Sequence, residues 1–284
     1  MKRQIAFLLS LAVCLAGCGQ NRVDQDGKAV KKHTDQEEKA VSAILKLGGK
    51  VYRDDKLPGR PVVTVYLTGS QVTDAGLKDI KELKGLRTLD LRGTQITGAG
   101  LKELEELKGL QLLSLGRTRI TDAGLKELKD LKALECVYLH DTQITDAGLK
   151  DLKELKGLRT LDLGGTQITG AGLKELKELK GLQLLSLGRT SITDAGLKDL
   201  KELKGLEVLW ITDTQITDAG LKDLKELKGL RILYLNGTKI TDAGLKDLKE
   251  LKDLQWLDLR HTQITNAGLK DLKEALPKTG FAGP

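Results

Sequence analysis

The chain has 284 residues, of which 31% are charged and 39% are hydrophobic but only 3% are aromatic. With so few aromatic residues a core must be built from leucine, and a solenoid does this by stacking similar Leu layers. The formal charge is +7, from 47 basic and 40 acidic residues. Because the two signs alternate closely in segments such as LKDLKELKG, they indicate a solvated surface and argue against a nucleic-acid footprint.

Residues 1–17 have the layout of an export signal. Lys2 and Arg3 precede an apolar run that is too short to span a membrane. The run ends in LAGC at Cys18, which resembles the lipobox of bacterial lipoproteins. That resemblance implies an acylated Cys18 as the first mature residue, anchored by lipid to a bacterial membrane of the cell envelope. The alternative is an ordinary signal peptide in which Cys18 is incidental.

The cysteine count predicts a fold without disulfides. Cys14 would be lost with the signal and Cys18 would carry lipid, so Cys136 would remain alone. Stability must then come from packing. No CxxC or Cys/His spacing suggests a metal site, and we predict no metal or other cofactor.

A tether and a cap precede the main domain. Residues 18–36 are polar and lack apolar periodicity, which predicts a flexible tether. Within residues 37–61, apolar spacing predicts a helix from Glu37 to Leu47 and a strand from Val51 to Arg53. Such a cap would cover the first Leu layer of the solenoid.

Residues 62–274 consist of nine repeats of 24 residues. The repeats start at Val62, Leu86, Leu110, Leu134, Leu158, Leu182, Leu206, Leu230 and Leu254. In each repeat, apolar residues first alternate and later recur every third residue, which predicts a short strand, a turn and a short helix. Residues 275–284 are predicted to form a C-terminal cap and tail, since Pro277 cannot continue the last helix.

The turn between strand and helix has its own pattern. Thr94 and its counterparts are expected to hydrogen-bond a neighbouring backbone group. Thr97 or the residue after it is expected to cap the helix, and that next residue is Asp in six repeats. Gly100 is glycine in every repeat, which predicts either a close backbone approach or a positive φ.

The phrase LxxLxLxxTxITDAGLxxLxxL resembles leucine-rich repeats, in a bacterial variant with Thr after the strand. This resemblance implies an α/β fold: a right-handed β-α solenoid with a parallel sheet on the concave face and short helices on the convex face. It also implies a protein that binds other macromolecules. The phrase beginning at Arg87 returns almost unchanged at Arg159, so repeats two to four are duplicated as five to seven.

Variation between the repeats is informative about function, because the repeated letters explain only folding. The third, fifth and seventh residues of each repeat alternate with inward Leu and therefore face the concave side. Both tryptophans and three of the four tyrosines stand at these positions, whereas the repeat helices contain no aromatic residue. Exposed aromatic clusters are typical of binding hot spots. The alternative is that aromatic residues simply favour strands.

These positions define a candidate binding surface near the C-terminal end of the concave face. An apolar centre and a polar rim are expected there. The predicted binding residues are Tyr138, Val208, Trp210, Asp213, Ile232, Tyr234, Trp256, Asp258, Arg260 and His261. Cys136 on the same face is expected to be a small apolar residue without redox chemistry.

No arrangement of catalytic residues or phosphate-binding loop is recognisable, so we predict that the protein is not an enzyme. The leading hypothesis is a monomeric scaffold that binds a protein ligand, and no nucleic-acid partner is expected. A second hypothesis is an envelope glycan, stacked on the same aromatic rings. A third is that Lys-rich helices dock on anionic membrane or nucleic acid, which would require a steep salt dependence.

Overall fold

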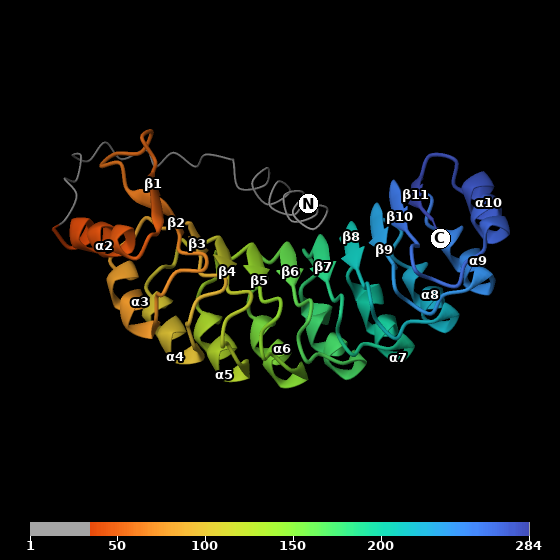
Figure 1. The fold of residues 1–284 in the computed structure, drawn as a ribbon, viewed down its shortest axis with the longest axis horizontal. Coiled ribbons are helices and arrows are strands. Elements are labelled where there is room, and N and C mark those ends of the chain that lie inside the picture. The colour runs from red at the N-terminus through yellow and green to blue at the C-terminus, as the bar shows by residue number, and fades with distance from the viewer. Residues whose placement is uncertain (1–34, 284) are drawn as a thin grey trace.

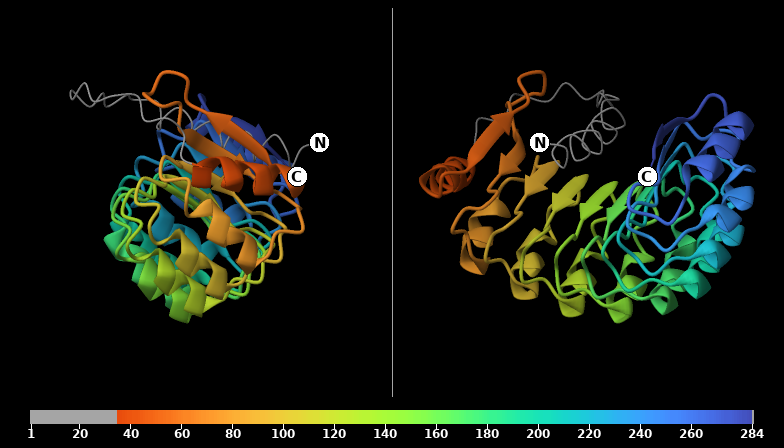
Figure 2. Two further views of the ribbon diagram at one scale, coloured as in Figure 1. Left: turned by 90° about the vertical axis from the view of Figure 1, so that its left-hand side faces the viewer. Right: turned by 45° about the vertical axis from the view of Figure 1, so that its right-hand side comes forward.

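The computed structural model describes residues 35–283, which form a solenoid with a curved sheet along its inner side (Figure 1). Eleven strands lie side by side in chain order, antiparallel between β1 and β2 and parallel from β2 to β11. Figures 1 and 2 show the strands on the concave side and the helices on the convex side. The predicted parallel concave sheet with short convex helices is confirmed.

The curvature has a simple physical cause. Neighbouring strands lie about 4.8 Å apart, whereas packed helices need roughly 10 Å. Stacking equal numbers of both therefore bends the array toward its sheet, and the strands lie along the concave side of the arc (Figure 2).

Each repeat contributes one short strand, and one further strand is added at each end. The strands are β1 (Lys50–Arg53), β2 (Val62–Tyr66), β3 (Thr88–Asp90), β4 (Leu112–Ser114), β5 (Cys136–Tyr138), β6 (Thr160–Asp162), β7 (Leu184–Ser186), β8 (Val208–Trp210), β9 (Ile232–Tyr234), β10 (Trp256–Asp258) and β11 (Gly280–Ala282).

The convex side mixes α-helical and 3₁₀-helical turns. The α-helices are α2 (Asp35–Lys46), α3 (Asp74–Ile80), α4 (Gly98–Leu101), α5 (Asp122–Leu125), α6 (Asp146–Leu152), α7 (Asp194–Leu197), α8 (Asp218–Leu224), α9 (Leu245–Leu248) and α10 (Asn266–Ala275). The 3₁₀ helices are η1 (Lys102–Leu104), η2 (Lys126–Leu128), η3 (Gly170–Glu178), η4 (Lys198–Glu202) and η5 (Asp242–Gly244). Leu recurring every third residue matches the three residues per turn of a 3₁₀ helix, which explains the tighter winding.

The core is a stack of Leu layers. In the repeat that starts at Leu158, every inward apolar residue has no exposed surface: Leu158, Leu161, Leu163, Ile168, Leu173, Leu176 and Leu179. The period of two on the strand and the period of three on the helix thus lead to the same interior. Burying one Leu side chain contributes about 1.5–3 kcal/mol, so these layers are the main source of stability.

The Thr after each strand closes the bend as the sequence predicts. Thr94 Oγ1 donates a hydrogen bond of 2.6 Å to the backbone oxygen of Leu91. The same bond recurs in the seven following repeats, at Thr118, Thr142, Thr166, Thr190, Thr214, Thr238 and Thr262. A backbone carbonyl is thereby satisfied in each of these eight turns.

Of the two capping residues that the sequence allows, Thr is the one that caps, and Asp has a different role. Thr145 is an N-cap whose hydroxyl accepts from the backbone N–H of Ala147 at 3.2 Å. Asp122 of the preceding repeat accepts from the backbone N–H and the hydroxyl of Thr145, at 2.8 and 2.6 Å. The carboxylate therefore joins two repeats instead of capping its own helix. Five further pairs repeat this contact: Asp74–Thr97, Asp146–Thr169, Asp194–Thr217, Asp218–Thr241 and Asp242–Thr265.

The glycine that is common to all repeats is explained by the same contact. A Cβ on Gly148 would lie 2.4 Å from Asp122 Oδ1, so a side chain would collide with the joining carboxylate. Where the preceding repeat has glycine in place of Asp, the backbones come together, and a Cβ on Gly124 would lie 2.8 Å from the Cα of Gly98. A close approach, and not a positive φ, accounts for this position.

Both ends of the Leu stack are covered. Helix α2 and strand β1 occupy the stretch for which the sequence predicts a helix and a strand, and Ala40 and Ile44 are buried against the first layer. At the other end α10 stops at Ala275, and Phe281 packs against the last layer. Phe281 does so from strand β11, which the sequence did not predict.

Several predictions concern residues 1–34, which lie outside the described part of the chain. These are the export signal, the lipid-bearing Cys18 and most of the tether. Within residues 35–283, no helix has the length and apolar character needed to cross a membrane.

Candidate binding surface

The register of the C-terminal strands brings the predicted aromatic residues together. Trp210 on β8 is opposite Tyr234 on β9, which is opposite Asp258 on β10. Two residues earlier on the same three strands, Val208, Ile232 and Trp256 are also in register. We define the C-terminal patch as Val208, Trp210, Ile232, Tyr234 and Trp256.

Trp210 and Tyr234 form the centre of the C-terminal patch. Their ring centroids lie 5.5 Å apart at an interplanar angle of 83°, an edge-to-face contact. Such pairs contribute about 0.5–1.5 kcal/mol beyond the area they bury. The Nε1 of Trp210 is buried, and among residues 35–283 it has no hydrogen-bond acceptor. A buried donor without a partner costs about 1–3 kcal/mol and calls for an explanation.

Trp256 is the most open member of the patch, with 38% of its surface exposed. Its ring lies over Gly280 of β11, where a Cβ would come within 2.8 Å of Trp256 Cε3. The absence of a side chain at Gly280 therefore leaves room for the ring beside the last strand. This support could not be foreseen, because β11 itself was not predicted.

Asp258 lies beneath the surface and not in the polar rim, which corrects the prediction for this residue. It has no exposed surface, and its carboxylate accepts from Nε and Nη2 of Arg260, the former at 2.8 Å. The backbone N–H of Arg260 also donates to it at 3.1 Å. Folding buries Asp258 because Arg260 neutralises its charge. Arg260 itself remains exposed, as predicted for the rim.

The buried carboxylate affects both of its neighbours. Burial and the negative charge of Asp258 raise the pKa of Tyr234, while Arg260 opposes this shift. The hydrogen bond and the charge of Asp258 raise the pKa of Arg260. Around neutral pH, Tyr234 is therefore a neutral hydroxyl and Arg260 a full cation.

The rim of the hollow is formed by the eighth residue of each repeat, which has a positive φ in all nine repeats. The residues of this rim column are Gly69, Gly93, Arg117, Asp141, Gly165, Arg189, Asp213, Gly237 and His261. A left-handed conformation costs a non-glycine residue about 1–2 kcal/mol. In five repeats a charged or polar residue adopts this conformation despite its energetic cost. The four glycines were the signal in the sequence that could have revealed this conformation.

Asp213 and His261 belong to this rim column and are exposed, and their role in binding stays a prediction. Asp213 leans toward the next repeat, since a Cβ on Gly237 would lie 2.0 Å from its Oδ1. Further along, Asp141 bridges Arg117 at 3.4 Å and Arg189 at 3.0 Å.

The N-terminal end of the sheet carries a matching arrangement, which we call the N-terminal counterpart: Tyr52, Tyr66, Asp90 and Arg92. Tyr66 is opposite Asp90, and the Asp90 carboxylate binds Arg92 Nε at 2.9 Å. Tyr52 meets Tyr66 edge to face at 5.8 Å. A Tyr opposite an Asp that binds the Arg two residues later, which we call the polar unit, therefore occurs at both ends of the concave face.

Comparisons with known proteins agree with this architecture. A family model described as Leucine Rich repeat matches residues 86–104, 158–177, 230–249 and 252–273. A leucine-rich-repeat protein of Leptospira interrogans is 29% identical, with a TM-score of 0.57, over 72% of this chain and 50% of that one. The chain folds as a leucine-rich-repeat solenoid.

Other solved leucine-rich-repeat structures share the fold at lower identity. Internalin C2 of Listeria monocytogenes is 24% identical with a TM-score of 0.59, over 84% of this chain and all of that chain. A plant peptide hormone receptor, solved in complex with RGF2, is 19% identical with a TM-score of 0.50, over 82% of this chain and 40% of that one. The present chain spans half the length of the Leptospira protein. No curated protein matches it.

Two predictions for the middle of the leucine-rich-repeat sheet need correction. Tyr138 is only 1% exposed, because it is buried in a small cluster with Leu112 and Cys136, and so it does not belong to an open binding surface. Cys136 is disulfide-bonded. The prediction of a fold without disulfides is therefore wrong for Cys136.

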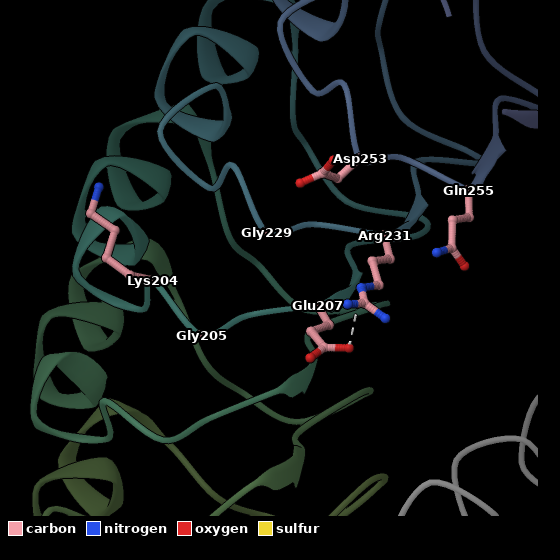
Figure 3. Close-up of a pocket in the computed structure, with 7 residues that line it drawn as sticks. All are labelled: Lys204, Gly205, Glu207, Gly229, Arg231, Asp253 and Gln255. Atoms are coloured by element: carbon pink, nitrogen blue, oxygen red, sulfur yellow. Dashed lines mark ion pairs between the residues drawn. The ribbon is translucent and has the colours of Figure 1, made fainter. Parts of the chain in front are cut away.

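A groove of about 390 Å³ lies where the chain enters β8, β9 and β10, next to the first residues of these strands (Figure 3). It is lined by Lys204, Gly205, Glu207, Gly229, Arg231, Asp253 and Gln255. Glu207 and Arg231 form an ion pair of 3.6 Å across it. The same pair recurs at Glu135 and Arg159, at 3.5 Å, so it is a feature of the repeat and not of this groove alone. The described residues contain no group of three His, Cys, Asp or Glu side chains suited to a metal ion.

Proposed function

We propose that the protein is a noncatalytic scaffold of the bacterial cell envelope that holds a partner protein against the C-terminal patch of its concave sheet. Leucine-rich-repeat proteins generally mediate protein–protein interactions, and solved structures similar to this chain include bacterial leucine-rich-repeat proteins. Anchoring by lipid on Cys18 is part of this proposal. It rests on the LAGC resemblance alone.

One observation carries the proposal: the C-terminal patch gathers both tryptophans of the chain over three adjacent strands. Trp256 offers an exposed ring, and Trp210 holds a buried N–H for which the described residues supply no acceptor. A partner that covers the rings and accepts from this N–H would bury apolar surface and remove an energetic cost in one step.

The test is capture of partner proteins from envelope extract by the purified full-length protein. Trp210→Ala combined with Tyr234→Ala should abolish capture and leave the solenoid folded, because both side chains lie on the sheet surface and not in the Leu core. The matched control is Tyr52→Ala combined with Tyr66→Ala, which removes the edge-to-face pair of the N-terminal counterpart. Equal capture by wild type and the Trp210/Tyr234 variant would exclude the patch.

A glycan of the envelope is the second candidate, favoured by the exposed ring of Trp256, on which a sugar could stack. Protease treatment of the extract before capture separates the two candidates. A protein ligand is destroyed by this treatment, whereas a glycan survives it. Repeating the capture at low and high salt tests whether the Lys-rich helices bind an anionic surface instead.

A further inference from the structure

Asp258 holds the guanidinium group of Arg260 along one edge, through Nε and Nη2, and the edge that includes Nη1 is open. A guanidinium group has five N–H donors, and Asp258 engages the Nε and Nη2 positions from below. Within residues 35–283, the structure gives this side chain no other acceptor, and 45% of its surface is exposed. At least Nη1 therefore keeps unused donors on a side chain that is partly open to solvent.

The carboxylate below Arg260 fixes its geometry before any ligand arrives. Asp258 is fully buried and accepts from the backbone N–H as well as the side chain of Arg260, so the guanidinium cannot turn away. A fixed planar fork loses less conformational entropy when it binds than a flexible chain does. It also matches a carboxylate through two parallel hydrogen bonds.

Aromatic side chains flank the carboxylate that holds this fork. Trp256 lies on the same strand and face as Asp258, and Tyr234 is opposite Asp258 on the neighbouring strand. A ligand group bound to Arg260 would therefore lie against aromatic rings, where water is partly excluded and a charge-assisted hydrogen bond is stronger.

The charges around the fork define what it can bind. The charge of Asp258 is compensated by Arg260, so the buried pair is close to neutral as a unit. His261 follows Arg260 on the rim, and Asp213 leans from two strands away toward Gly237, whose N–H donates to the backbone oxygen of Arg260. Asp213 is thus the acidic group that faces this region and would repel an anion.

We infer that Arg260, held by Asp258, is the specificity-determining residue of the C-terminal patch and binds an acidic side chain of the partner protein that stands next to an aromatic or large aliphatic residue. This inference rests on the proposed function and adds the chemistry of the partner. The carboxylate pairs with the open edge of the fork, and the neighbouring apolar side chain lies on Trp256 and Tyr234.

The probes are two matched peptides, acetyl-Phe-Asp-Phe-amide and acetyl-Phe-Asn-Phe-amide, which differ only in the charge of the central residue. Trp210 and Trp256 are the only tryptophans of the chain, so its tryptophan fluorescence reports on the patch alone. The Asp peptide should change this fluorescence with an affinity roughly tenfold higher than that of the Asn peptide.

Arg260→Lys is the informative variant, because a lysine still neutralises Asp258 but lacks the two-pronged edge. It should weaken binding of the Asp peptide by about tenfold and leave the weak binding of the Asn peptide unchanged. Arg92→Lys at the N-terminal counterpart is the matched control and should change neither. Asp213→Asn should strengthen binding of the Asp peptide, because it removes the opposing charge.

Equal affinity for the two peptides, or equal effects of Arg260→Lys and Arg92→Lys, would overturn the inference. Tighter binding of glucuronate than of the Asp peptide would replace the acidic side chain by an acidic sugar and overturn it as well. If capture from extract is lost in the Trp210/Tyr234 variant while the two peptides bind alike, the proposed function stands and only the role of Arg260 fails.

Discussion

The two ends of the concave sheet carry the same polar unit in different surroundings. At the C-terminal patch, Tyr234, Asp258 and Arg260 lie beside Ile232 and Trp256. At the N-terminal counterpart, Tyr66, Asp90 and Arg92 lie beside two threonines, Thr64 and Thr88, at the corresponding positions. Tyr, Asp and Arg are thus common to both ends, and the apolar third residues of the last repeats are what distinguish the C-terminal end.

The ends differ also in how the sheet continues. The N-terminal counterpart is closed by the antiparallel strand β1, whose Tyr52 is 51% exposed and pairs with Tyr66. The C-terminal patch is closed by the parallel strand β11, whose Gly280 supports Trp256. Single substitutions can therefore test each difference between the two ends separately.

The largest expected effect should be the same at both ends, because the Leu core beneath them is the same. Leu233→Ala under the C-terminal patch and Leu89→Ala under the N-terminal counterpart each remove a fully buried side chain. Each should lower the free energy of unfolding by about 2–5 kcal/mol, measured by urea denaturation. A much smaller loss at Leu233 would mean that the patch lies on a loosely packed end.

Gly280→Ala should disturb the packing of Trp256 at the C-terminal patch and leave the N-terminal counterpart unchanged. The added Cβ would lie 2.8 Å from Trp256 Cε3, so the ring must shift, at a cost of about 1–3 kcal/mol. Tryptophan fluorescence and thermal melting would both report the change. Gly109→Ala is the control, since its Cβ would meet nothing closer than 3.9 Å and should be tolerated. An unchanged spectrum for Gly280→Ala would show that Trp256 does not depend on β11.

The smallest effect is the alkaline titration of the two tyrosines. Burial and then Asp258 raise the pKa of Tyr234, and burial and then Asp90 raise that of Tyr66. A raised pKa in the folded state contributes stability below the ordinary tyrosine value of about 10, which is lost as the pH rises through the folded value. Asp258→Asn should therefore lower the pKa of Tyr234 and leave that of Tyr66 unchanged, and Asp90→Asn should do the reverse. Ultraviolet absorbance titration measures both. Identical titration curves for the two variants would contradict the local origin of the shifts.

Much of the fold could be predicted because the repeat states it many times over. Alternating and three-residue spacings of Leu indicated the strand, the helix and the face that each buries, and the Thr of the turn was assigned its role correctly. The Asp before AGL could not be assigned in the same way. Its partner, the Thr of the next repeat, is 23 residues away, and a preference for helix caps is a purely local signal.

The sequence predicted which residues of the candidate site are neighbours on adjacent strands. It did not predict which of these side chains are buried. Equal repeats place Trp210, Tyr234 and Asp258 side by side, so their proximity follows from counting. The burial of side chains does not follow from counting. Asp258 is buried beneath Arg260, and Tyr138 is buried beside Leu112. The support from Gly280 was missed because three residues of strand in an otherwise irregular tail carry too little pattern.

The central claim is that a partner lies on the C-terminal patch and not along the whole concave face. Photo-crosslinking from single sites tests it most directly, with Tyr234→p-benzoylphenylalanine compared with Tyr66→p-benzoylphenylalanine in the full-length protein at the native envelope. The account predicts a crosslinked partner protein, identified by mass spectrometry, from position 234 and none from position 66. Equal labelling from both positions, or labelling from position 66 alone, would contradict it.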